Sequence, residues 1–107
     1  MAVTAAPDMA ALEEKAAEAA RMLRLLSNER RLLVLCYLAG EGELGVGALA
    51  DMVGLSQPAL SQHLAKLRED GLVATRKEAQ AVFYRLADPK VARLLAVLRE
   101  LYCPAAA

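Results

Sequence analysis

Cys36 and Cys103 are the two side chains of this 107-residue chain best suited to covalent chemistry. A cysteine thiolate is a nucleophile that can be oxidised to a disulfide, and it is also a soft metal ligand. Two cysteines are too few for the disulfide framework of a small secreted protein, which favours thiol chemistry in a reducing compartment. Free cysteines also serve as small apolar side chains in cores, so that role stays open for both.

The remaining residues give little support to a metal site or an active site. A zinc centre usually takes four nitrogen or sulfur ligands, whereas the chain offers these two thiols and one histidine, His63. The sequence also lacks a glycine-rich phosphate loop and a set of nucleophile, base and orienting residue. We therefore expect a protein that is not an enzyme and that needs no metal and no cofactor.

A predicted helix that begins after Ser56 carries a different kind of polar surface. Ser56 is a good N-cap, and Leu60, Leu64 and Leu67 form an apolar row that faces inward. At about 100° per residue, the opposite side displays mostly small or amide-bearing side chains: Gln57, Pro58, Ser61, Gln62, Ala65, Lys66 and Glu69. Amide groups pair with adenine and small hydroxyls fit close to base edges, so this side suits DNA reading, although ordinary solvated positions have the same composition.

His63 lies at the edge of the apolar row rather than at the centre of this polar side. A single histidine beside a core row is more often a hydrogen-bonding structural residue than a ligand or a switch. We therefore favour a structural role for His63 and keep contact with DNA as the alternative.

Length and composition indicate one domain, residues 1–107, with flexible ends at 1–7 and 105–107. Of all residues, 57% are apolar, more than a small core needs, which suggests a subunit interface. The net charge is zero, but residues 1–55 carry five Lys and Arg against eight Asp and Glu, and residues 56–107 carry eight against five. The longest apolar run is far below the ~20 residues of a membrane span, so we expect a cytoplasmic protein with no membrane partner.

Periodic apolar patterns and turn residues give a consistent order of elements. Ser27 or Asn28 can cap the second helix, and Pro89 suits the first position of the last. The sequence predicts helices over 8–26 and 29–39, a short helix ending at 54, the polar helix closed at 70–71, strands over 72–75 and 81–86, and a helix from 89 to 103. This is a mainly α (α+β) fold of five helices with a two-stranded hairpin.

The order of elements is that of a winged helix-turn-helix, and three segments strengthen the match. Residues 54–73 (GLSQPALSQHLAKLREDGLV), with 26–33 and 75–86, resemble the ArsR/SmtB family of bacterial repressors. The resemblance spans nearly the whole chain after the first helix. It implies that the hairpin is a wing, that a homodimer forms through the first and last helices, and that the partner is a palindromic double-stranded operator.

The resemblance also implies roles for individual side chains on DNA. Gln57, Ser61 and Gln62 are the predicted base-reading residues, and Ser56 and His63 belong to the same contact surface. Contacts with backbone phosphates, which supply affinity without much sequence choice, are assigned to the basic residues Lys66, Arg76, Lys77 and Arg85. The wing departs from the common family pattern, because an alanine and a glutamine at 79–80 stand where a glycine followed by a basic residue is usual.

The metal-binding positions of the family are mostly missing. The thiol motif of its arsenic and cadmium sensors falls near positions 44–47, which hold leucine, glycine, valine and glycine. The terminal-helix zinc site pairs an aspartate with later histidines, and no histidine follows Asp88. The cysteine pair instead resembles the BigR/SqrR subgroup of persulfide-responsive repressors, as does the wing segment 78–84.

By that resemblance, Cys36 and Cys103 are redox-sensing residues. The reduced protein is expected to bind its operator, and reactive sulfur species are expected to link the two thiols through a disulfide or polysulfide and release the DNA. Such a bridge joins the helix that supports the reading unit to the helix of the dimer interface, which changes the angle between two reading heads. The alternatives are an oxidant that forms a plain disulfide, a metal-sensing repressor, and an interaction module that no longer reads DNA.

Overall fold

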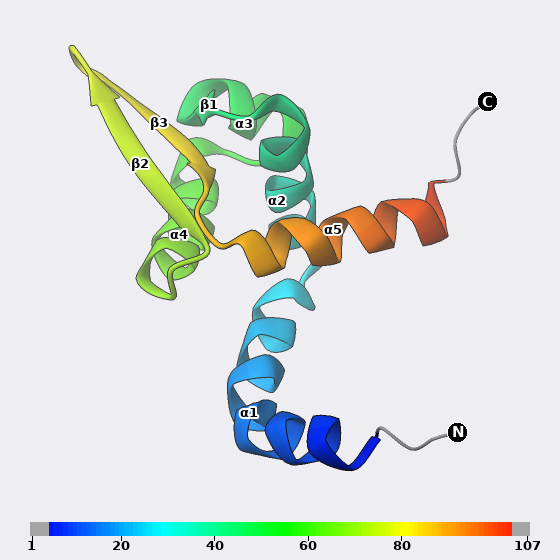
Figure 1. Cartoon of the computed structure of the whole chain (residues 1–107). Coiled ribbons are helices and arrows are strands. Elements are labelled where there is room, and N and C mark those ends of the chain that lie inside the picture. Colours follow the sequence, from blue (N-terminus) through cyan, green and yellow to red (C-terminus); the bar gives the residue numbers. More distant parts are fainter. Residues whose placement is uncertain (1–4, 104–107) are drawn as a thin grey trace.

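The computed structural model describes residues 5–103, with side chains from Met9 onward, as five helices and three strands (Figure 1). In chain order the elements are α1 (Ala5–Leu26), α2 (Glu29–Glu41), β1 (Leu44–Gly45), α3 (Val46–Val53), α4 (Gln57–Glu69), β2 (Val73–Glu78), β3 (Ala81–Leu86) and α5 (Pro89–Tyr102). The predicted fold class is confirmed. Residues 1–4 and 104–107 lie outside the described residues, whereas residues 5–7, predicted to belong to a flexible end, lie in the first turns of α1. No helix within residues 5–103 has the length and apolar character needed to cross a membrane.

Helix α2 lies at the centre of the core, as its continuous apolar stretch predicts. Val34, Leu35 and Leu38 on α2 are at most 1% exposed. They belong to one cluster with buried side chains of α3, α4 and α5, among them Leu49, Leu60, Leu64, Leu67, Val91 and Leu95. Burial of each large aliphatic side chain is worth about 1.5–3 kcal/mol. The inner side of α4 is thereby fixed, which leaves its opposite side to solvent.

Side-chain caps fix the starts of three helices. Each cap accepts a hydrogen bond from a backbone N–H two or three residues further on: Asn28 from Arg31 at 3.1 Å, Ser56 from Ala59 at 3.3 Å and Asp88 from Lys90 at 2.9 Å. The cap of α2 is therefore Asn28 and not Ser27, whose hydroxyl donates to the carbonyl of Arg24 at 3.0 Å. Gly54 ends α3 with a φ of 73°, a left-handed conformation that glycine adopts without steric cost.

The wing is the β2–β3 hairpin, which a short third strand extends. All pairs are antiparallel in the order β1-β3-β2, and Tyr84 on β3 lies opposite Thr75 on one side and Leu44 on the other. The predicted hairpin is confirmed, but β2 runs on to Glu78 instead of ending at Thr75, and β1 is absent from the sequence prediction. Ala79 in the hairpin turn has a φ of 56°, which is strained for a residue with a side chain.

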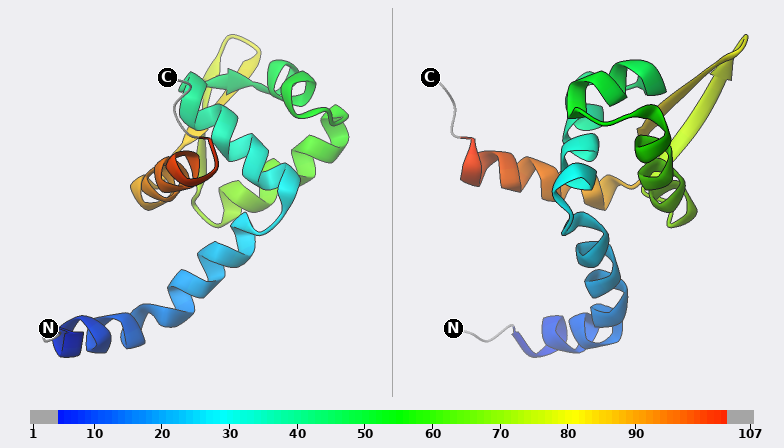
Figure 2. Two further views of the ribbon diagram at one scale, coloured as in Figure 1. Left: turned by 90° about the vertical axis from the view of Figure 1, so that its right-hand side faces the viewer. Right: turned by 180° about the vertical axis from the view of Figure 1, so that it is seen from behind.

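Helices α1 and α5 form the outer parts of the molecule (Figures 1 and 2). Helix α1 buries Leu25 and Leu26 against the core at its C-terminal end, and its N-terminal part extends away from the body. The outer end of α5 projects away from the wing. These two helices expose most of the large hydrophobic side chains found on the surface: Met9, Leu12, Leu23, Val97, Leu101 and Tyr102.

Candidate DNA-binding surface and thiol cavity

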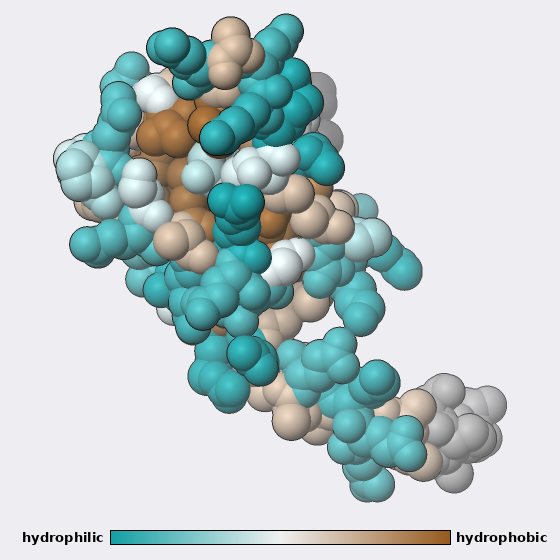
Figure 3. All heavy atoms as spheres, turned by 90° about the vertical axis from the view of Figure 1, so that its left-hand side faces the viewer, coloured by the Kyte–Doolittle hydropathy of each residue, from teal (hydrophilic) through white to brown (hydrophobic). Residues whose placement is uncertain are grey.

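Helix α4 and the wing lie on the same side of the molecule, away from the outer end of α5 (Figures 1 and 2). The predicted base-reading residues Gln57, Ser61 and Gln62 are exposed on α4, and Lys66 is exposed one turn after Gln62. Ser56 is exposed as well, although its hydroxyl already caps the helix. Figure 3 views this side and shows hydrophilic side chains over much of it, with apolar atoms between them. The polar side chains of α4 are therefore available to a partner.

His63 makes a specific contact inside the protein. Its Nδ1 accepts a hydrogen bond from Arg31 Nε at 3.2 Å, and the side chain is half-buried between α4 and α2. Burial lowers the pKa of His63, and the positive charge of Arg31 lowers it further. The ring is therefore held neutral, with its hydrogen on Nε2 because Nδ1 is the acceptor.

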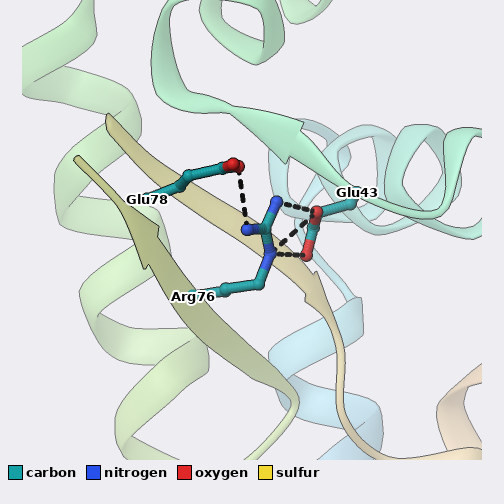
Figure 4. A network of polar contacts seen from close by, with 3 residues as sticks. All are labelled: Glu43, Arg76 and Glu78. Carbon is teal, nitrogen blue, oxygen red and sulfur yellow. Dashed lines mark hydrogen bonds and ion pairs between the residues drawn. The ribbon is translucent and has the colours of Figure 1, made fainter. Parts of the chain in front are cut away.

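Arg76 lies against the protein rather than pointing freely outward (Figure 4). Its Nη2 and Nε lie 2.7 Å and 3.1 Å from the two carboxylate oxygens of Glu43, and its Nη1 lies 3.0 Å from Glu78. The guanidinium also lies 4.9 Å from the centre of the Phe83 ring. The hydrogen bonds to Glu43 and Glu78 raise the pKa of Arg76, and the bond from Arg76 lowers the pKa of Glu43. The charge predicted to meet a phosphate is thus largely balanced by Glu43 and Glu78.

Lys77 and Arg85 are the other basic residues of the hairpin, and both are exposed. Neither forms an ion pair with a carboxylate of the described residues. The positive charge of Arg85 does reach Glu43, whose pKa it helps to lower. Of the three predicted phosphate contacts in the wing, these two keep an unbalanced charge.

The structure brings the two cysteines to the same cavity. Cys36 on α2 and Cys103 at the end of α5 are free thiols, the first half-buried and the second exposed. Both line a cavity of about 530 Å³ together with Leu32, Leu95, Leu98, Arg99 and Tyr102. The sequence left open whether two residues so distant along the chain lie near each other. The packing of α5 against α2 brings them together.

The two thiols differ in their surroundings and therefore in their reactivity. Burial raises the pKa of Cys36, the positive charge of Arg99 lowers it, and the nearby Cys103 raises it. Burial is the largest of these effects, so Cys36 is mostly a protonated thiol near neutral pH. Cys103 is exposed and is therefore the more accessible of the two thiols to a dissolved reagent.

The described residues hold no group of three or more His, Cys, Asp and Glu side chains that could bind a metal ion. The two cysteines of the cavity are accompanied by apolar side chains and by Arg99, a cation that repels metal ions. The donor set around the thiols therefore suits sulfur chemistry better than metal binding.

Two contacts escape sequence reasoning because each joins distant segments. One is the Glu43–Arg76 ion pair, and the other is the bond that Arg30 Nη1 donates to the carbonyl of Val53 at 2.7 Å. Val53 is the last residue of α3, so Arg30 ties the start of α2 to the turn that precedes α4. No local pattern distinguishes Arg30 or Glu43 from other exposed charged residues.

The arrangement of α2, α3 and α4 followed by a hairpin defines a winged helix-turn-helix protein, a class that places one helix in the major groove of DNA. Residues 28–75 match the model of the bacterial regulatory protein, arsR family. The chain belongs to the ArsR family of bacterial transcriptional regulators.

Curated relatives of this chain are named as regulators of transcription. The transcriptional activator HlyU of Vibrio cholerae is 52% identical over 88% of this chain and 86% of its own length. The biofilm growth-associated repressor of Agrobacterium fabrum is 46% identical over 87% of this chain and 79% of its own length.

A solved structure with the same arrangement is that of the transcriptional repressor BigR from Xylella fastidiosa. It superimposes with a TM-score of 0.83 at 42% identity and covers 89% of this chain and 96% of the other. Reduced HlyU from Vibrio cholerae superimposes with a TM-score of 0.81 at 52% identity, covering 86% of this chain and 96% of the other. This chain is thus a transcriptional regulator and not an enzyme.

Proposed function

We propose that this protein is a dithiol redox-responsive repressor. As a homodimer it binds a palindromic operator when reduced, and it leaves the operator when reactive sulfur species link Cys36 to Cys103. The observation that carries the proposal is the cavity shared by these two thiols, because the sensing reaction needs both sulfur atoms within one protomer. The operator lies in the cytoplasm, where thiols are kept reduced between episodes of oxidation.

The two thiols have complementary roles in the reaction. The Cys103 thiolate attacks the terminal sulfur of a persulfide RS–SH, the S–S bond breaks and RS⁻ leaves, so that Cys103 itself becomes a persulfide. The Cys36 thiolate then attacks the Cys103 sulfur and releases HS⁻. The two cysteines lose two electrons and two protons, and the persulfide is reduced to a thiol and hydrosulfide. If a second persulfide first transfers its terminal sulfur to the Cys103 persulfide and leaves as a thiolate, Cys36 attacks the middle sulfur, releases HS⁻ and forms a trisulfide.

Arg99 assists the attack of Cys36 on the Cys103 persulfide, a step that the burial of Cys36 hinders. Because burial raises the pKa of Cys36, little of its thiolate exists when the second attack is due. The guanidinium of Arg99 lines the same cavity and favours the thiolate. Its positive charge also attracts anionic persulfides of low molecular weight.

The homodimer links the reaction to DNA. The exposed apolar side chains of α1 and α5, such as Leu12 and Leu101, lack cover within the described chain and form the proposed interface. A dimer reads two half-sites about one helical turn apart, so a changed angle between its two α4 helices weakens contacts at both half-sites together. A bridge between α2 and α5 acts on that angle, because α2 supports the reading helix and α5 lies in the interface.

The experiment that tests the proposal follows DNA binding and bridge formation together. The reduced protein is titrated against a duplex from the region upstream of its own gene, then treated with a low-molecular-weight persulfide or with hydrogen peroxide. We expect release after persulfide, recovery with a reductant, and a mass that shows one intramolecular bridge. The variants Cys36→Ser and Cys103→Ser should bind the duplex and stay bound after treatment. Release of either variant by persulfide contradicts the proposal.

The second candidate is a general oxidant sensor that uses the same thiols and a plain disulfide. It is favoured by the exposure of Cys103, which also admits peroxide. A bridge that contains additional sulfur atoms after persulfide treatment, with slow or no release by peroxide, supports the first candidate. Equal release by both reagents with a plain disulfide supports the second.

A further inference from the structure

Three helices bring four basic side chains around one small cavity beside α4. The cavity measures about 300 Å³. It is lined by Arg21 and Arg24 from α1, Arg31 from α2, Lys66 from α4, and by Leu25 and Asp70. Its four cations face a single carboxylate, although the chain as a whole has no net charge. The local excess of positive charge is therefore a property of the fold rather than of the composition.

Asp70 shows how strongly this cavity favours an anion. Its side chain is only 9% exposed, and its Oδ1 accepts a hydrogen bond from Arg21 Nη2 at 3.2 Å. Its Oδ2 is buried without a hydrogen bond and lies 3.5 Å from Lys66 Nζ. A carboxylate so far removed from water is stable only when cations compensate its charge. Arg21 and Lys66 therefore hold one anionic group already.

Arg24 and Arg31 keep their charge for another anion. Among the described residues, no carboxylate forms an ion pair with either of them. Arg31 uses only its Nε in the bond to His63, which leaves its two terminal nitrogens free to donate, and Arg24 is exposed. A guanidinium presents a planar set of N–H donors that suits the oxygens of a phosphate.

The cavity adjoins the surface proposed to read bases. Lys66 lines the cavity and also follows Gln62 by one turn on the exposed side of α4. A helix that enters the major groove has a sugar-phosphate backbone along its flank, and phosphate contacts there fix its register. We propose that Arg24 and Arg31 form a subsite for a backbone phosphate of the operator, beside Lys66, whose charge Asp70 and Glu69 already share. The inference rests on the proposed DNA-binding function and adds a contact outside α4 and the wing.

The test measures the salt dependence of DNA binding. Reduced wild-type protein, Arg24→Gln and Arg24→Glu are titrated against the upstream duplex and a scrambled duplex over a range of salt concentrations. Arg93→Gln, which removes an exposed arginine of α5, is the matched control. We expect Arg24→Gln to lower the slope of log affinity against log salt by about one for each bound protomer. The control should keep the wild-type slope.

The two duplexes separate this proposal from the proposed function. A phosphate contact carries no sequence choice, so Arg24→Gln should bind both duplexes more weakly by the same factor and keep the preference between them. Between about 50 mM and 200 mM salt, the variant should lose about threefold less affinity per protomer than the wild-type protein loses. An unchanged slope in both Arg24 variants overturns the subsite while the proposed function stands. If the wild-type protein shows no preference for the upstream duplex, the proposed operator binding is overturned, but the salt slope still tests the subsite. If it binds neither duplex, the proposed function and the subsite are both overturned.

A separate arm asks whether the anion is a free one. The melting temperature of wild-type and Arg24→Gln protein is measured with and without inorganic phosphate at equal ionic strength. We expect no difference between the two proteins in their response. Stabilisation of the wild-type protein alone, together with an unchanged salt slope, assigns the cavity to a free anion and overturns its assignment to the DNA backbone.

Discussion

Glu43 and Arg76 form a two-point ion pair across 33 residues of sequence, with Arg76 Nη2 2.7 Å from Oε1 and Nε 3.1 Å from Oε2. Glu43 lies between α2 and β1, and Arg76 lies in β2, so the pair ties the segment after α2 to the wing across β3. Because the guanidinium of Arg76 is paired with Glu43, we infer that it orients the hairpin that carries Lys77 and Arg85.

Glu43→Gln tests whether the Glu43–Arg76 ion pair orients the wing. Glu43→Gln should leave the fold intact, speed hydrogen exchange in β2 and β3, and weaken DNA binding, because the wing loses a fixed orientation. Glu41→Gln, an exposed neighbour without an ion pair in the described structure, is the control. If hydrogen exchange in the wing of Glu43→Gln is unchanged, the ion pair does not orient the wing.

The same pair makes a pH-dependent contribution to stability. The bond from Arg76 lowers the pKa of Glu43 in the folded protein, so the folded state holds fewer protons than the unfolded state. The stabilisation is complete above the ordinary glutamate pKa of about 4.3 and is lost as the pH falls through the lower folded value. Denaturant titrations should show the wild type losing its advantage over Glu43→Gln in this acidic range.

A second pH effect belongs to His63. Its folded pKa lies below the ordinary value because of burial and the charge of Arg31, so the unfolded chain takes up a proton first as the pH falls. Stability from this residue is present above about pH 6.5 and is lost as the pH falls through the folded pKa. His63→Gln, which keeps an acceptor for Arg31, should flatten the stability curve between neutral and mildly acidic pH. An identical curve in both proteins speaks against the lowered pKa.

Ala79→Gly should stabilise the protein. The left-handed conformation costs alanine about 1–2 kcal/mol of strain in the folded protein. Glycine avoids this strain, but its greater conformational freedom in the unfolded chain costs about 0.5–1 kcal/mol on folding. The net gain at a φ of 56° is about 0.5 kcal/mol, seen as a small rise in melting temperature. Gln80→Gly is the matched control and should be neutral or destabilising, since the structure gives Gln80 no positive φ.

Gln62→Ala tests base reading. Loss of a bidentate contact with adenine costs about 1–3 kcal/mol of discrimination. Binding to the upstream duplex should weaken by that amount, and binding to a scrambled duplex should not change. Equal weakening on both duplexes shows that Gln62 does not read sequence.

Leu12→Glu tests the proposed dimer interface. Leu12 on α1 is 52% exposed within one chain, and a carboxylate there is costly if a second protomer covers it. Sedimentation should show a shift from dimer to monomer. Met52→Glu alters a large exposed side chain of α3 outside the proposed interface and should remain dimeric. A dimeric Leu12→Glu excludes this part of α1 from the interface.

Local signals in the sequence predicted most of the fold. The Ser56 cap, the glycine that ends α3 and the proline that opens α5 each act within one or two turns of the chain, and all three are confirmed. The strand β1 escaped prediction because two residues among glycines carry no periodicity. The strand β2 was predicted too short because its outer half is polar and exposed, which resembles a loop.

The candidate sites were predictable in composition but not in arrangement. The polar side of α4 follows from one helix and its angular spacing, so Gln57, Ser61 and Gln62 are exposed as predicted. The shared cavity of the cysteines depends on how α5 crosses α2, and the position of Arg76 depends on a partner 33 residues away. Such contacts between distant segments are set by packing, which no local pattern encodes.

The hydrogen bond from Arg30 to the carbonyl of Val53 couples the start of α2 to the turn before α4. We propose that a bridge at Cys36 tilts α2 and moves this turn with it, while the leucines beneath stay buried. The reduced and bridged proteins should therefore bind DNA with different affinity, and the bridged protein should unfold with a smaller dependence on urea, because the bridge keeps its unfolded chain more compact.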